Sequence, residues 1–187
     1  MNFETILSIC LGIGLASASG FRVFLPIFAL SLASYFGVIP LNENWSWIGG
    51  LPALISFGAA MIFEIGAYYI PFVDNLLDTI AIPLATVAGF VVMASTLIDV
   101  DSTITTILAI IAGGGTALAT QSLTTTTRLA SSVKTAGVGN PILSTAETGT
   151  AITLSSFAIF LPIVAVILVV IIFALIYWIY KKITIKN

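Results

Sequence analysis

Arg22 is the first residue of this chain whose chemistry requires an explanation. It stands in the apolar stretch LASASGFRVFLP, residues 15–26. A guanidinium at the centre of a lipid bilayer costs roughly 2.5–3.5 kcal/mol even on lenient insertion scales, so it must face protein or water and find a partner. Glu64, in the equally apolar stretch MIFEIG, is the expected partner. The pair is predicted either to hold two helices together or to line a polar site at membrane depth.

Two further carboxylates follow Glu64 in the segment PFVDNLLDT. Asp74 and Asp78 are one helical turn apart, so in a helix both carboxylates share a face and could form an acidic pocket beside Arg22. Asp74 could instead cap a helix that begins at Asn75. Carboxylates without histidine suit a hard cation such as sodium or magnesium. This spacing fixes no ligand geometry, however, and we predict no metal site and no cofactor.

A second polar segment runs from Gln121 to Thr150. One interpretation is an exposed, flexible loop. The other is that residues 120–133, which contain no Gly or Pro, continue the preceding helix and place Arg128 and Lys134 on a cavity-lining or interfacial face. Such a face could receive an anionic headgroup or solute. The residues predicted to bind a substrate or ion are Arg22, Glu64, Asp74, Asp78, Arg128, Asn140 and Glu147.

The composition indicates what kind of protein carries these residues. Hydrophobic residues make up 59% of the 187 and charged residues only 7%, whereas soluble domains are about 25% charged. The surface is therefore predicted to face lipid. The net charge of -2 and the lack of a basic run exclude nucleic acid as a partner. A single cysteine and the absence of histidine exclude an internal disulfide, histidine-based zinc sites and histidine-based catalytic triads.

The apolar sequence divides into blocks that can cross a membrane, since a spanning helix needs about 20 largely apolar residues. The first block is too long for one upright span, and its polar centre around Arg22 predicts two short helical pieces that meet at a break. We therefore expect an all-α membrane helix bundle of about five to six segments, forming a single domain over residues 1–187. The blocks are Phe3–Phe36, Ile48–Ile70, Ile80–Ile98, Ile104–Leu123 and Ile152–Tyr180.

Prolines and lysines suggest where these segments end and how they are oriented. Pro71 is predicted to end the second block, and Pro83 to lie in the first turn of the third, where its missing N–H costs little. By the positive-inside rule, the lysines after the last block place the C-terminus in the cytoplasm. The chain is thus expected to be a multi-pass protein of the cell membrane. The lysines are Lys181, Lys182 and Lys186.

The chain also contains a weak internal similarity. Residues 5–18 align with residues 106–119, with identical Thr, Ile, Leu, Gly and Ala at several positions of constant offset. Small apolar residues recur by chance in membrane helices, so the alternatives are coincidence and a duplication with halves 1–100 and 101–187. A duplication predicts a helix break at Thr120–Ser122 that corresponds to the break at Ser19–Arg22. Paired broken helices are typical of sites at the midplane of transporters.

Three motifs resemble those of a family of small prokaryotic integral-membrane proteins catalogued as domain of unknown function number 4126. The first is SGFRVFLP, residues 19–26, and the second is Glu64 followed by IPFVDNLLDT, residues 70–79. The third comprises Asn140, Pro141, Ser144 and Glu147. The resemblance implies a multi-span membrane protein and supplies no activity. Family members often carry a histidine and an acidic pair in the third motif, whereas this chain has Glu147-Thr148 and no histidine. The resemblance therefore does not support a proton relay there.

These observations lead to two hypotheses from different classes. The first is a small transporter or permease-like protein with the seven residues around its site and a small solute or ion as its partner. The alternative is a structural or assembly protein without transport activity, in which Gly113, Gly114 and Gly115 pack against a partner helix. An intramembrane lipid enzyme ranks behind both, because no nucleophile stands beside a base. We expect no enzyme activity. We expect the protein to contact membrane lipid, and it could form a homo-oligomer.

Overall fold

The computed structural model describes residues 2–135 and 137–184, and all regular elements in those two ranges are helices. The expected all-α fold is confirmed. The α-helices are α1 (Phe3–Ser19), α2 (Phe24–Tyr35), α3 (Leu51–Ala67), α4 (Pro71–Thr96), α5 (Ser102–Leu108), α6 (Gly115–Thr135), α7 (Asn140–Phe160) and α8 (Pro162–Thr184). A 3₁₀ helix, η1 (Glu43–Gly49), precedes α3, and a π-helix, η2 (Ala109–Gly114), joins α5 to α6.

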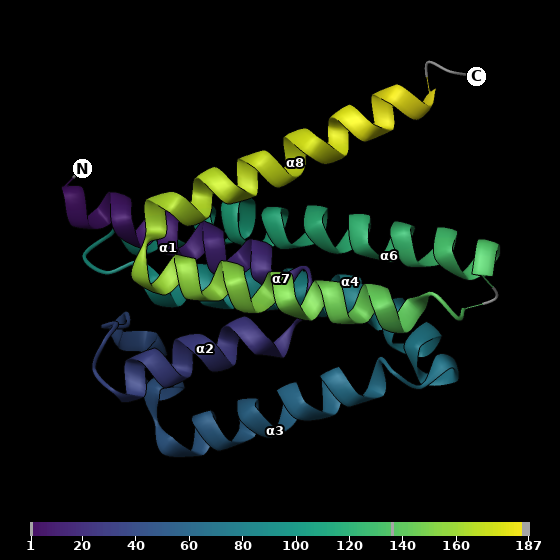
Figure 1. Ribbon diagram of the computed structural model, residues 1–187. Coiled ribbons are helices and arrows are strands. Elements are labelled where there is room, and N and C mark those ends of the chain that lie inside the picture. The colour runs from purple at the N-terminus through teal and green to yellow at the C-terminus, as the bar shows by residue number, and fades with distance from the viewer. Residues whose placement is uncertain (1, 136, 185–187) are drawn as a thin grey trace.

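The helices run back and forth along one axis, as Figure 1 shows, with α1 in the middle of the bundle. Helix α1 contacts α4, α6, α7 and α8, while α2 and α3 pair along one side and α8 lies along the opposite side. Buried Leu15, Leu30 and Val92 form the apolar core between α1, α2 and α4. We call the end that holds the start of α1 and the end of α4 the N-terminal end of the bundle.

The predicted break in the first apolar block is confirmed between α1 and α2. Helix α1 ends at Ser19, and α2 begins at Phe24. Gly20 lies so close to α6 that an added Cβ atom would stand 2.4 Å from Cβ of Thr120. This close approach requires glycine and brings the residues after it, Arg22 included, into the interior of the bundle.

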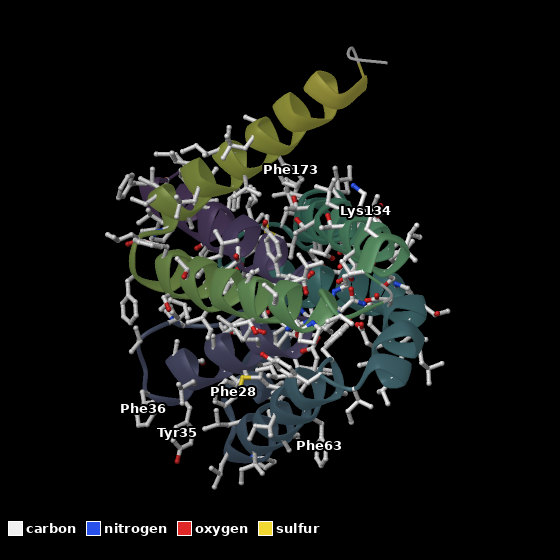
Figure 2. The ribbon with its side chains drawn as sticks, turned by 45° about the vertical axis from the view of Figure 1, so that its right-hand side comes forward. Phe28, Tyr35, Phe36, Phe63, Lys134 and Phe173 are labelled. Carbon is white, nitrogen blue, oxygen red and sulfur yellow. The ribbon has the colours of Figure 1, made fainter. Side chains whose placement is uncertain are left out.

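The exterior is apolar enough for membrane insertion. Within the part of the chain that the structure describes, two helical stretches, Leu76–Thr96 and Ser102–Thr135, are long and apolar enough to cross a membrane. The pair η1 and α3, bent by 63°, would form a third span if it crosses as one unit. Phe63 is 78% exposed, and the side chains of Phe63 and Phe36 project from the surface of the bundle in Figure 2. Shorter apolar helices cover Phe3–Ser19, Phe24–Tyr35 and Pro162–Leu175.

Several predicted boundaries are wrong. The second block does end before Pro71, because α3 ends at Ala67, but Pro71 itself starts α4. Pro83 lies inside that helix rather than in its first turn. The last apolar block is not a single segment, because α7 ends at Phe160 and α8 starts at Pro162. Leu161 between them leaves the helical conformation (φ −140°, ψ 66°), and the following proline disfavours the α region for this residue.

The loop interpretation of residues 121–150 is also wrong for most of that segment. Helix α6 continues to Thr135, as the alternative interpretation predicted, and α7 begins at Asn140. The second break predicted at Thr120–Ser122 does not occur. Thr120 and Ser122 donate their hydroxyl hydrogens to the carbonyls four residues earlier, at 2.9 and 2.7 Å, so these side chains are satisfied within the helix. The duplication of two halves stays a prediction.

Candidate functional site

The structure brings all seven predicted site residues together in one buried cluster. They come from the α1–α2 link, the C-terminal part of α3, the first turns of α4, the middle of α6 and the first turns of α7. Each of them is buried, and Arg22 and Arg128 are only 1% and 2% exposed. The cluster therefore lies inside the bundle, toward the end opposite its N-terminal end.

Arg22 binds the first turns of α7. Its Nε donates to Oγ1 of Thr148 at 2.9 Å, and Nη2 donates to the carbonyl and hydroxyl oxygens of Ser144 at 2.8 and 2.5 Å. Its Nη1 lies 3.5 Å from Oε2 of Glu147, which is an ion pair. The prediction that Arg22 pairs with Glu64 is therefore wrong. The α1–α2 link points the guanidinium at α7 instead of α3.

Glu64 has a different role, at the start of α2. Its Oε1 accepts the backbone N–H of Val23 at 2.7 Å, and its Oε2 accepts that of Phe24 at 3.0 Å. The first N–H groups of a helix have no partner within the helix, and the helix dipole favours a negative charge there. Glu64 of α3 thus caps the N-terminus of α2 and stabilises the non-helical link that contains Arg22.

Arg128 is the most heavily paired side chain of the cluster. Its Nε donates to both carboxylate oxygens of Glu147, at 3.0 and 3.1 Å, and its Nη2 donates to Oε2 of the same residue. Its Nη1 donates to Oδ1 of Asp74 at 2.5 Å. Asp78 lies farther away, with Oδ1 4.0 Å from Nε. Glu147 is therefore shared between both arginines.

Asp74 and Asn140 join the start of α4 to the start of α7. Nδ2 of Asn140 donates to Oδ2 of Asp74 at 2.7 Å and to Oγ of Ser132 at 3.0 Å. Helix α4 starts at Pro71, so Asp74 lies within its first turn, and the prediction that it caps a helix starting at Asn75 is wrong. Its carboxylate instead accepts hydrogen bonds from Arg128 and Asn140.

Tyr68 lies at the centre of the cluster and was not among the predicted residues. The guanidinium carbons of Arg22 and Arg128 stand 4.3 and 4.2 Å from the centroid of its ring. Both distances are within the range of cation–π interaction, in which the negative face of the ring attracts the cation. Tyr68 follows Glu64 by four residues, so helical periodicity could have placed it on the same face.

Ser144 and Thr148 were also missed as ligands of Arg22. Together with Glu147 they follow the i, i+3, i+4 spacing that puts side chains on one face of a helix. The signal was thus present in the sequence, but only the fold shows that this face meets Arg22. Lys134, by contrast, is exposed near the end of α6, where Figure 2 labels it, and takes no part in the cluster.

The charge balance of the cluster is negative. It contains the two guanidinium groups of Arg22 and Arg128 and four carboxylates, from Glu64, Asp74, Asp78 and Glu147. Arg128 was predicted to receive an anion. Its hydrogen-bond donors already bind the carboxylates of Glu147 and Asp74, so they are not available to an anionic ligand. Within residues 2–135 and 137–184, no group of three or more acidic, histidine or cysteine side chains has the geometry to hold a metal ion.

The comparison with known families is consistent with the motifs that build this cluster. A family model described as a domain of unknown function, DUF4126, matches residues 9–182. The chain belongs to the DUF4126 family. No curated protein and no solved structure matches the chain.

Each of the three DUF4126-like motifs contributes to the cluster. The first supplies Arg22, the second supplies Asp74 and Asp78, and the third supplies Asn140, Ser144 and Glu147. Arg128 lies outside these motifs, in the threonine-rich part of α6. In this DUF4126 chain, segments far apart in the sequence therefore meet through their charged and polar side chains.

Proposed function

We propose that the protein is a multi-pass transporter or permease-like protein of the prokaryotic cell membrane, which moves a small solute or ion through the charged cluster. The observation that carries this proposal is the burial of two arginines and four carboxylates inside an apolar bundle, beside the break between α1 and α2. Ionisable groups at membrane depth are costly and typically mark ion or substrate pathways. Interrupted helices whose N-termini face charged groups are a recurrent feature of transporter sites.

A cavity beside the cluster supports access to it. A cavity of about 310 Å³ lies between α2, α3 and α4, and Glu64 and Tyr68 form part of its wall. The remaining lining is apolar and includes Phe24 and Leu77. Tyr68 links this cavity to the cluster, because the same side chain lines the cavity and contacts both arginines.

A second cavity lies at the N-terminal end of the bundle. It has a volume of about 650 Å³, and Glu4, Ser8 and Asp99 are among its lining residues. Leu11 also lines it, and the part of α1 from Leu11 to Ser19 rises roughly 12 Å before the break that holds Arg22. Fully buried Leu15 fills this interval. The apolar packing supports a site that is closed toward one end of the bundle, as alternating access requires.

The distribution of charge supports an orientation in the membrane. The N-terminal end of the bundle carries acidic side chains without a basic one among the described side chains, namely Glu4, Glu43, Asp99 and Asp101. The opposite end carries Lys134, and α8, whose sequence includes Lys181 and Lys182 near its end, runs toward that end. By the positive-inside rule, the end with the lysines faces the cytoplasm, and the start of α1 faces outward.

Charge movement across proteoliposomes tests the transport function. Full-length protein is reconstituted on a solid-supported membrane, and currents are recorded after jumps in sodium, potassium, ammonium or proton concentration. Wild type is expected to give a transient current with at least one probe, and Arg22→Ala and Asp78→Asn are expected to abolish it. Glu43→Gln, an exposed change outside the cluster, should keep the current. No current from wild type with any probe, or an unchanged current in Arg22→Ala, would refute the proposal.

A structural or assembly role is the second candidate, and one observation favours it. A groove of about 370 Å³ between α7 and α8, lined by small residues such as Ala146, Gly149 and Thr150, could receive a helix of a partner. Of the three glycines predicted to serve a partner, however, Gly113 and Gly114 pack against α4, and only Gly115 has open space beside it. Crosslinking in membranes followed by native purification should yield a stoichiometric partner if this second role is correct.

A further inference from the structure

Two buried oxygen atoms at the edge of the cluster have no hydrogen-bond donor. They are Oδ1 of Asp78 and Oδ1 of Asn140. Both residues are more than nine-tenths buried, at 8% and 4% exposure. Both atoms are acceptors, so each of them lacks a donor or a positive charge beside it. A buried acceptor without a partner costs about 1–3 kcal/mol, which makes such an atom a natural place for a ligand.

Asp78 is a carboxylate of the cluster to which neither arginine donates a hydrogen bond. Arg128 is held by Glu147 on one side and by Asp74 on the other, with the donor contacts described above. Oδ1 of Asp78 lies 4.0 Å from Nε of Arg128, which is beyond hydrogen-bond distance. Asp74 and Asp78, one turn apart on α4, thus compete for one guanidinium, and Asp74 is the one that is bound.

The ligand that fits this position is small and positively charged. An anion is excluded by the surplus of carboxylates over guanidinium groups. A metal ion needs several oxygen ligands in a defined geometry, and the described residues offer no such group. A proton needs only one oxygen.

We propose that Asp78 is a proton-binding residue whose carboxyl group loads and releases a proton as part of the transport cycle. The inference rests on the proposed transport function and names its coupling ion. A proton from the surrounding water forms the O–H bond at Asp78, and the same bond breaks when the proton returns to water. Loading therefore removes one negative charge from the cluster without oxidation or reduction.

The groups around Asp78 come from each element packed against the start of α4. Helix α6 contributes Arg128, α7 contributes Glu147 and Asn140, and α4 itself contributes Asp74. Helix α3 adds Tyr68 and Glu64 to the same cluster, and the α1–α2 link adds Arg22. Among these charged groups, the carboxylates outnumber the guanidinium groups, so neutral Asp78 is favoured in this arrangement.

Proton release would change how Arg128 is shared. Ionised Asp78 would compete with Glu147 for Arg128, because both carboxylates lie within 4.0 Å of the same Nε atom. Glu147 would then be free to tighten its ion pair with Arg22, whose Nη1 lies 3.5 Å from Oε2. Arg22 belongs to the break between α1 and α2, so the protonation of Asp78 is coupled to the interrupted helices.

Infrared spectroscopy of the full-length protein in lipid tests the proton directly. In a pH titration, wild type is expected to show a carboxylic-acid C=O band that persists to higher pH than the bands of exposed carboxyl groups. Asp78→Asn should remove this band. Asp99→Asn is the matched control and should keep it, because Asp99 is exposed at the other end of α4 and its positive φ (55°) suits asparagine.

The outcomes separate this inference from the transport function. Absence of the band in wild type, or its persistence in Asp78→Asn, would overturn the assignment, and the wild-type titration alone decides this if Asp78→Asn does not fold. A band that depends on Asp78 in a protein without any transport current would support the proton site and refute transport. If wild type lacks the band but still gives a current, and this current does not depend on a pH gradient, only the proton site is refuted.

Discussion

Glu147 is the residue on which both arginines depend. It binds Arg128 through both carboxylate oxygens and lies within ion-pair distance of Arg22. In a low-dielectric interior, an ion pair offsets its desolvation only while both partners are present. Removing one shared carboxylate therefore affects two guanidinium groups at once.

Glu147→Gln is expected to lower the free energy of unfolding by about 3–5 kcal/mol, the cost of leaving a buried charge without its partner. Denaturant unfolding of the purified protein in detergent measures the change. Glu43→Gln removes the same charge from an exposed position in η1 and should leave stability nearly unchanged. Equal stability of the two variants would show that Glu147 does not hold the arginines.

The ring of Tyr68 contacts both guanidinium groups, with their carbons 4.3 and 4.2 Å from its centroid. Tyr68→Phe retains the ring and should keep stability close to that of wild type. Tyr68→Leu removes both cation–π contacts and is expected to cost about 1–4 kcal/mol, since each contact contributes about 0.5–2 kcal/mol. Unfolding curves of the two variants give the comparison. A phenylalanine variant as unstable as the leucine variant would assign the effect to the hydroxyl group instead.

At the scale of elements, α4 and the π-helix η2 touch through glycine. A Cβ atom on Gly113 would stand 2.4 Å from the backbone oxygen of Gly89, and one on Gly89 would stand 2.6 Å from the backbone oxygen of Gly113. Real Cβ atoms do not approach a backbone oxygen so closely, so the two backbones must separate if a side chain is added. This contact sets the position of α4, which carries Asp74 and Asp78.

Gly113→Ala is expected to destabilise the protein by about 1–3 kcal/mol, the usual cost of overpacking a core. Gly115→Ala is the matched control two residues later, because nothing lies within 4 Å of its added Cβ atom. It should stabilise the helix by about 0.5–1 kcal/mol, since alanine has the higher helix propensity. Thermal unfolding followed by circular dichroism measures both. A neutral Gly113→Ala would argue against the close contact of α4 with η2.

At the scale of the whole molecule, the two ends of the bundle differ in charge. Glu43 lies at the acidic end and Lys134 at the opposite end. The proposed orientation predicts that a membrane-impermeant maleimide applied to intact cells labels Glu43→Cys and not Lys134→Cys. Both variants are made in a Cys10→Ala background, because Cys10 is the single native cysteine. Labelling of both in permeabilised cells is the control, and the reverse pattern in intact cells would invert the orientation.

Composition and residue spacing were sufficient to predict the class of the molecule. A chain with 7% charged residues cannot cover its surface with polar groups, so an apolar exterior follows from composition. Apolar blocks of about 20 residues then indicate helices. The same argument singled out the site residues, because a buried charge is too costly to be incidental. Arg22, Glu64 and Arg128 were thus recognisable without a structure, and so was the break after Ser19.

Only the tertiary structure decided which charge meets which. Arg22 pairs with Glu147, 125 positions away in the chain, and Glu64 caps α2, because the packing of α7 against the α1–α2 link determines these distances. The boundary at Leu161 and the uninterrupted α6 also depended on local bonds that composition does not reveal. Sequence states how costly a buried charge is, but the arrangement of the helices determines the partner that offsets the cost.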